Sequence, residues 1–85
     1  MRERRERFGT NLKEARDRAD LSQEELSFQA KLNRTTISLY ERGLREPGID
    51  ALVKMAAVLK TTPNALCEGI EWQPQKQSFR VQKPR

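Results

Sequence analysis

Residues 21–43, with the sequence LSQEELSFQAKLNRTTISLYERG, decide the fold of this chain. Ser22 is followed three positions later by Glu25, and this Ser-x-x-Glu pattern is a capping box that starts a helix at Gln23. The apolar positions that this helix buries are Leu26 and Ala30. The pattern therefore predicts a short helix over residues 23–30.

A second short helix follows almost at once. Asn33 is a good N-cap, and Gly43 is suited to the left-handed conformation that ends a helix. Between them, Ile37 and Tyr40 have the spacing of an inner face, so we expect a helix over residues 34–42. Two helices joined by so short a turn form a helix-turn-helix unit, although such pairs occur in any all-helical domain.

The flanking sequence predicts three further helices. A first helix runs from residue 3 or 8 to residue 19, with an apolar stripe of Phe8, Leu12, Ala15 and Ala19. A Pro-Gly pair precedes a helix over residues 49–59, whose inner positions are Leu52, Met55, Ala56 and Leu59. Thr62 followed by Pro63 starts a short last helix that ends near Gly69. We expect an all-α domain of four or five short helices.

The C-terminal arm has a different pattern. Between residues 70 and 81, apolar residues alternate with polar ones, which is the period of a strand. The apolar members are Ile70, Trp72, Phe79 and Val81, on either side of a polar loop. We expect two short strands, either paired as a hairpin or shared with a second subunit; a disordered arm is the alternative.

A chain of 85 residues is long enough for one domain and too short for two. We divide it into a basic N-terminal extension of the first helix over residues 1–7, a helix-turn-helix domain over residues 8–69, and a C-terminal arm over residues 70–85. The arm serves either as a dimerisation strand or as a flexible tail.

Missing residue types exclude several classes of function. The chain has no histidine and a single cysteine, Cys67, which excludes imidazole catalysis, an intramolecular disulfide and a metal site built from histidine or several cysteines. The sequence also lacks a nucleophile–base pair and a phosphate-binding glycine loop. We therefore expect no enzyme activity, no metal and no cofactor, and no small-molecule ligand is evident.

The sequence offers no membrane or export segment. Its longest apolar run covers five residues, 55–59, whereas a membrane-spanning helix needs about 20. The basic N-terminus is followed at residues 9–14 by a polar stretch instead of the apolar stretch of a signal peptide. We expect a cytoplasmic protein.

The charge is unevenly distributed along the chain. The net charge is +5, with +3 in residues 31–45 and −3 in residues 14–25. A protein with one face that binds a polyanion would have this pattern. Ordinary solvated charges are the alternative.

The outer face of the helix over residues 34–42 carries the candidate contacts to DNA bases. A helix fits the major groove, and its N-terminal residues point at base edges. Arg34 can donate two hydrogen bonds to guanine, and Leu39 can pack on a thymine methyl group. Thr35 and Ser38 offer hydroxyl groups. The alternatives are a phosphate contact or solvation for Arg34, and incidental exposure for Leu39.

Other residues are suited to contact the DNA backbone. Gln23 lies at a helix N-terminus, where free N–H groups and the helix dipole attract a phosphate. Arg42 and Arg45 flank Gly43, and Lys31 lies in the turn between the two helices. We expect these contacts to determine affinity and its salt dependence.

Taken together, these motifs resemble the Cro and phage-repressor family of helix-turn-helix proteins, which are xenobiotic-response-element-like bacterial transcriptional regulators. The resemblance covers about residues 8–69. It depends on LSQEEL at 21–26, RTTIS at 34–38, YERG at 40–43, Pro47 and LVKMAAVL at 52–59. It implies a compact five-helix DNA-binding domain whose second helix-turn-helix helix is the recognition helix.

The resemblance also implies roles for single residues. In the family, an arginine of the first helix pairs with a glutamate near the end of the recognition helix, and Arg16 and Glu41 match these positions. Two exposed charges are the alternative. The family's glutamine at the position of Gln23 binds a phosphate. The chain departs from the family at Lys31 and Asp20, where glycine is common, and a left-handed Lys31 would be strained.

One recognition helix covers only a few base pairs, so specific binding normally needs two. We expect a homodimer formed by the C-terminal segment, with contacts from Leu66, Ile70, Trp72, Phe79 and Val81. Phe28, on the outer face of its helix, is either a second partner contact or a stray exposed aromatic residue.

The sequence thus predicts a regulator of transcription that binds double-stranded DNA sequence-specifically. The simplest form is a repressor that binds a palindromic or pseudo-palindromic operator as a homodimer. The alternative is an antitoxin or adaptor that uses the same fold mainly to bind another protein. Control by a regulatory protein or by the protein's own concentration fits the absence of a ligand-binding domain.

Overall fold

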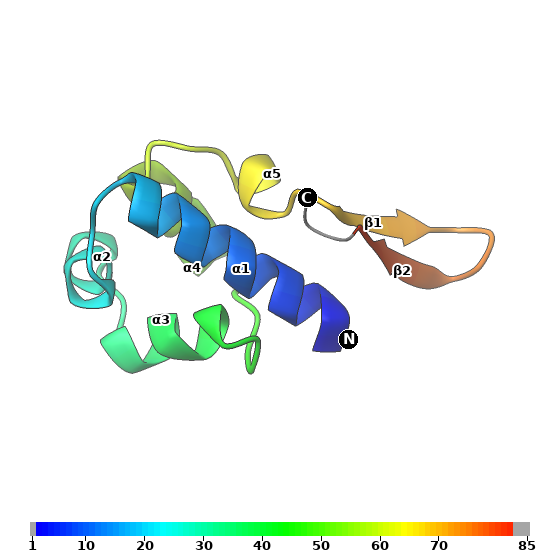
Figure 1. Cartoon of the computed structure of the whole chain (residues 1–85), viewed down its shortest axis with the longest axis horizontal. Helices are drawn as coiled ribbons and strands as arrows, with labels where there is room; N and C mark the ends of the chain where they lie inside the picture. Colours follow the sequence, from blue (N-terminus) through cyan, green and yellow to red (C-terminus); the bar gives the residue numbers. More distant parts are fainter. Residues whose placement is uncertain (1, 83–85) are drawn as a thin grey trace.

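The computed structural model describes residues 2–82, which form five helices followed by a two-stranded antiparallel sheet (Figure 1). The elements are α1 (Arg2–Arg18), α2 (Gln23–Ala30), α3 (Arg34–Glu41), α4 (Ile49–Val58), α5 (Pro63–Leu66), β1 (Ile70–Gln73) and β2 (Ser78–Val81). Helix α1 packs against α3 and α5, while α2 packs against α3 and α4. The hairpin projects beyond the N-terminal part of α1. The predicted five-helix repressor-like fold is confirmed, with strands in place of a disordered arm.

The short helices begin where local side-chain hydrogen bonds replace missing backbone partners. The Ser22 hydroxyl accepts from the Glu25 N–H at 3.0 Å, and the Glu25 carboxylate accepts from the Ser22 N–H at 2.8 Å. This capping box also lowers the pKa of Glu25. The remaining predicted caps of the short helices are formed by Asn33, whose Oδ1 accepts from the Thr35 N–H, and by Thr62. The predicted starts of α2, α3 and α5 are therefore correct, whereas α1 begins at Arg2, earlier than the predicted residue 3 or 8.

The core lies where α1 to α5 meet. Its largest fully buried side chains are Leu12, Leu26, Ile37, Met55 and Leu66. Gly9 permits α1 to lie directly against the last turn of α3, because a Cβ atom there would lie 2.5 Å from the Tyr40 carbonyl oxygen. The predicted inner face of α4 is partly wrong, since Ala51 is buried and Leu52 is only partly buried. Leu52 instead lines a groove toward the hairpin.

Within two residues of their last helical residue, α1, α2 and α4 are each followed by a residue that has a left-handed backbone and is not glycine. The φ angle is 58° at Asp20, 54° at Lys31 and 54° at Lys60, whereas Gly43 takes this conformation after α3 at 73°. At each site an N–H group of the following residue bonds to a carbonyl five residues earlier, as Leu32 does to Ser27. This hydrogen bond holds the chain in the left-handed conformation, which costs a side chain with a Cβ atom about 1–2 kcal/mol.

Glycine at two of these positions is expected to stabilise the protein. Lys31→Gly and Lys60→Gly should each raise the free energy of unfolding by about 0.5–1 kcal/mol, because the relieved strain exceeds the entropic cost of glycine. Urea denaturation measures the change. As a control, Lys54→Gly in the exposed interior of α4 should instead destabilise by about 1 kcal/mol. Equal destabilisation by all three variants would show that the left-handed sites are not strained.

The C-terminal hairpin pairs within the chain. Ile70 lies opposite Val81 and Trp72 opposite Phe79, so these four side chains share one face of the sheet. Of the arrangements that the sequence left open, the described residues form the intrachain hairpin. The predicted extension and arm also include residue 1 and residues 83–85, which lie outside the described part of the chain.

Leu66 was predicted at a dimer surface, and this prediction is wrong. Its side chain is 1% exposed and belongs to the core, because the single turn of α5 packs against α1 and α4. The Asn11 side chain fixes this turn by donating to the Leu66 and Glu68 carbonyl groups, each at 2.9 Å. Within residues 2–82, no helix combines the length and hydropathy that a bilayer crossing requires.

Candidate nucleic-acid interface

Helix α3 has one face in the core and one toward solvent. Ile37 and Tyr40 are buried, and the phenol ring of Tyr40 packs edge-on against Phe8 at 6.5 Å between ring centres. Of the four predicted base contacts, Arg34 and Thr35 are exposed, while Ser38 and Leu39 are half-buried. We expect all four residues on the outer face of this helix, and neighbouring segments partly cover Ser38 and Leu39 there. The side chains available to a partner therefore lie mainly in the first turn of α3.

A buried ion pair joins α1 to the end of α3. Arg16 Nε lies 2.6 Å from Glu41 Oε2, and Arg16 Nη2 lies 3.0 Å from Glu41 Oε1. The two side chains are 12% and 4% exposed. Hydrogen bonding to Glu41 raises the pKa of Arg16, and the Arg16 Nη1 group also donates to the Leu21 carbonyl. The pair thus fixes α3 against α1 and the segment that leads into α2.

Gln23 belongs to the same network. Its amide Nε2 donates to Glu41 Oε1 at 3.0 Å, across from the first turn of α2 to the last turn of α3. One of its two amide N–H groups is therefore used within the protein, and the other can still donate to a ligand. The sequence did not indicate this hydrogen bond, since the two residues are 18 positions apart.

The basic residues predicted to contact phosphates lie at three places around α3. Lys31 lies in the turn before it, Arg42 caps its C-terminus and Arg45 follows in the next loop; all three are exposed. Gly43 makes this last turn possible, since it has a left-handed backbone and lies against Glu6 of α1. Together with Gln23 these cations give the α3 side of the molecule groups that bind anions.

A second ion pair, between α1 and the loop after α3, was not predicted. Arg4 donates two hydrogen bonds to the Glu46 carboxylate, at 3.1 and 2.7 Å, and Arg5 lies 3.5 Å from the same group. The Arg4 contact holds the pKa of Glu46 below its usual range. The Arg4 guanidinium also lies 4.7 Å from the ring centre of Phe79. Arg4 therefore links the loop that carries Arg45 to the hairpin.

Comparison with known proteins identifies this arrangement. A model of the helix-turn-helix family HTH_3 matches residues 12–66. The chain belongs to this Cro-type helix-turn-helix family. The match includes the whole of α2 and α3, the caps at Ser22 and Asn33, and the ion pair between Arg16 and Glu41.

Three similar proteins are named as control proteins. The chain is 36% identical over 62 residues to the control protein C.BamHI of Bacillus amyloliquefaciens, which covers 72% of this chain and 76% of the relative. It is 41% identical over 66 residues to the control protein C.MunI of a Mycoplasma species, and the matched region covers 76% of this chain and 89% of that relative. The crystal structure of the restriction-modification controller protein C.AhdI from Aeromonas hydrophila superposes with a TM-score of 0.70 at 35% identity, covering 73% of this chain and 94% of that one.

Membership in the family settles the class of function. This helix-turn-helix protein is a DNA-binding transcriptional regulator, and the prediction that it is not an enzyme is confirmed by the family. The hairpin lies after the part that the family model matches.

Proposed function

We propose that this protein is a homodimeric repressor that binds a palindromic or pseudo-palindromic operator, with α3 of each subunit in the major groove. The observation that carries the proposal is the first turn of α3, where Arg34 and Thr35 are exposed opposite the buried Ile37 and Tyr40. Such a turn can reach base edges while the rest of the helix stays packed on the domain. Arg34 donates to guanine, and Thr35, Ser38 and Leu39 make the remaining base contacts.

The groups around α3 support a role in backbone binding. Gln23, Lys31, Arg42 and Arg45 contact phosphates on both sides of the groove, and each neutralised phosphate adds about 0.9 to the slope of log affinity against log salt. Arg16 and Glu41 act indirectly, because they hold the N-terminus of α2 and the C-terminus of α3 in one fixed geometry. Such a regulator works in the cytoplasm, where it represses a promoter that its operator overlaps. The names of its relatives make restriction–modification genes the first to test.

The hairpin supplies the surface for dimerisation. Trp72 and Phe79 pack edge-on at 5.1 Å between ring centres, and they remain 53% and 43% exposed. Ile70 and Val81 lie on the same face and are half-buried. A pair of exposed aromatic residues of this size is typical of an interface core. A second copy that covers this face would supply the second α3 helix that an operator with two half-sites requires.

Removal of the Trp72 ring tests the dimer surface. Trp72→Ala is expected to raise the dimer dissociation constant at least about tenfold, because buried aromatic residues contribute most to interfaces. Sedimentation velocity at micromolar concentration measures the change. Phe28→Ala is the matched control, since Phe28 is 83% exposed on α2 and lies outside the hairpin. A wild-type protein that is monomeric, or an equal effect of Phe28→Ala, would contradict this surface.

Selection of bound sequences from a random DNA library tests the proposed function. A homodimeric regulator should enrich a sequence with twofold symmetry and two half-sites about 10 base pairs apart. Enrichment of an asymmetric site would reject the dimeric operator. A pool that stays random would favour a protein that uses this fold mainly to bind another protein.

A further inference from the structure

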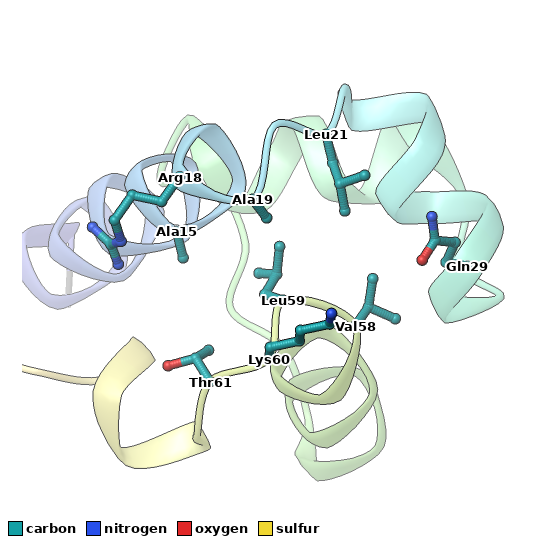
Figure 2. A pocket seen from close by; sticks show the side chains of 9 residues that line it. All are labelled: Ala15, Arg18, Ala19, Leu21, Gln29, Val58, Leu59, Lys60 and Thr61. Atoms are coloured by element: carbon teal, nitrogen blue, oxygen red, sulfur yellow. The ribbon is translucent and has the colours of Figure 1, made fainter.

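A cavity of about 540 Å³ lies away from α3, between the C-terminal ends of α1 and α4 and one side of α2 (Figure 2). Its volume lies in the range of small-molecule sites, roughly 300–1,000 Å³. Nothing in the proposed DNA contacts or in the hairpin uses it.

One part of the cavity wall is apolar. Ala15 and Leu59 are buried core residues, and Ala19, Leu21 and Val58 are half-buried beside them. The core thus reaches the surface at this place, and an apolar group of a ligand would be removed from water against it.

The polar groups of the cavity are cations and neutral donors. Arg18 comes from α1, Gln29 from α2, and Lys60 and Thr61 from the segment after α4. Figure 2 shows the Gln29 amide extending from α2 toward Val58 and the Lys60 amine beside Val58, whereas the Arg18 guanidinium lies along α1 and points away from both. None of the described residues that line the cavity is acidic. Within residues 2–82, neither Arg18 nor Lys60 forms an ion pair, although Arg4, Arg16 and Lys13 all do.

Lys60 occupies its position at a cost. Its φ angle of 54° favours glycine, yet a lysine stands there at the edge of the cavity. Strained residues with side chains in a cavity are found at ligand sites more often than elsewhere. Lys31 has the same φ angle but does not line the cavity, and it therefore provides a matched comparison.

From the apolar part of the wall, the Lys60 amine without an acidic partner and the absence of acidic residues among the described lining residues, we infer that this cavity binds a small organic anion with an apolar body, a medium-chain or aryl carboxylate. The carboxylate lies between the Lys60 amine and the Gln29 amide, and the apolar body lies on Leu21, Val58 and Leu59. Because residues of α1, α2 and α4 line the cavity, a bound carboxylate would contact the first helix of the helix-turn-helix unit directly.

Titration of the full chain with sodium octanoate, followed by amide chemical shifts, tests the site. We expect saturable shifts confined to residues 15–21, 29 and 58–61, with a dissociation constant of about 1 mM, the affinity expected of a ligand with so few atoms. Octylamine, which has the same chain and the opposite charge, should cause no such shifts.

Two glycine variants distinguish the effect of the Lys60 ammonium group on octanoate binding from the effect of relieving backbone strain. Lys60→Gly should weaken octanoate binding at least about tenfold, while Lys31→Gly, which relieves the same strain elsewhere, should leave the affinity unchanged. Both variants keep the fold. The site is rejected if octanoate causes no shifts at 10 mM, if the shifts concentrate at Trp72 and Phe79, if octylamine binds equally well, or if Lys60→Gly binds like the wild type.

Discussion

Replacing Glu41 by alanine is expected to lower the free energy of unfolding by about 3–5 kcal/mol, a large part of the stability of so small a domain. The change leaves the Arg16 guanidinium, 12% exposed, without the carboxylate that binds it at 2.6 and 3.0 Å. It also removes the acceptor of the Gln23 amide. A charge that stays buried without its partner costs far more than the intact pair contributes. Urea denaturation followed by circular dichroism measures the loss.

The matched control is an exposed ion pair on α1, the helix that carries Arg16. Lys13 lies 3.1 Å from Asp17, and both side chains are more than half exposed, so Lys13→Gln should change stability by less than about 1 kcal/mol. The double variant Arg16→Met, Glu41→Leu should be less destabilised than Glu41→Ala, because it leaves no buried charge unpaired. If Glu41→Ala and Lys13→Gln cost the same, the pair does not hold α3 in place.

Replacing Arg34 by alanine is expected to weaken binding to the selected operator by about 1–3 kcal/mol, roughly 5- to 150-fold. Arg34 is exposed in the first turn of α3, and its side chain can donate two hydrogen bonds to one guanine. The variant should lose the preference for one base at one position in each half-site and keep the wild-type preference at all other positions. Repeating the library selection with the variant measures this preference directly.

Arg45 gives the comparison for a backbone contact. Arg45→Ala should weaken binding to all sequences about equally and lower the salt slope by about 1, because a phosphate contact carries no base preference. An Arg34→Ala variant with the preference of the wild type at every position, and only a reduced salt slope, would show that Arg34 binds the backbone and no base.

The local part of the fold could be predicted from the sequence. The caps at Ser22, Asn33 and Thr62 depend on residues two or three positions away, so each helix start is a short-range property. The left-handed backbone of Lys31 is likewise a short-range property, because only a left-handed residue lets the chain turn from α2 to α3 in so few residues.

Contacts between distant segments could not be predicted in this way. Arg4 and Glu46 are 42 residues apart, and neither belongs to a recognisable motif. Leu66 has the apolar character of an interface residue, and only the packing of α5 on α1 and α4 shows that it belongs to the core. The pair of Arg16 and Glu41 was expected from a family resemblance alone, because no local pattern connects them.

The half-burial of Leu39 has the same origin. The helical spacing of α3 assigns Leu39 to the outer face, but the exposure of a side chain also depends on the segments beside the helix. The spacing thus indicates which side of α3 faces outward, and the surrounding fold determines that Arg34 and Thr35 are its accessible residues.

The most direct test of the account is methylation interference on the operator obtained from the random library. Dimethyl sulfate modifies guanine N7 in the major groove and adenine N3 in the minor groove. With α3 in the major groove, methylation of guanine N7 within each half-site should abolish binding of the wild type, and Arg34→Ala should lose this sensitivity at one guanine per half-site. Binding that is blocked only by adenine N3 methylation, or by no base methylation, would contradict the placement of α3 in the major groove.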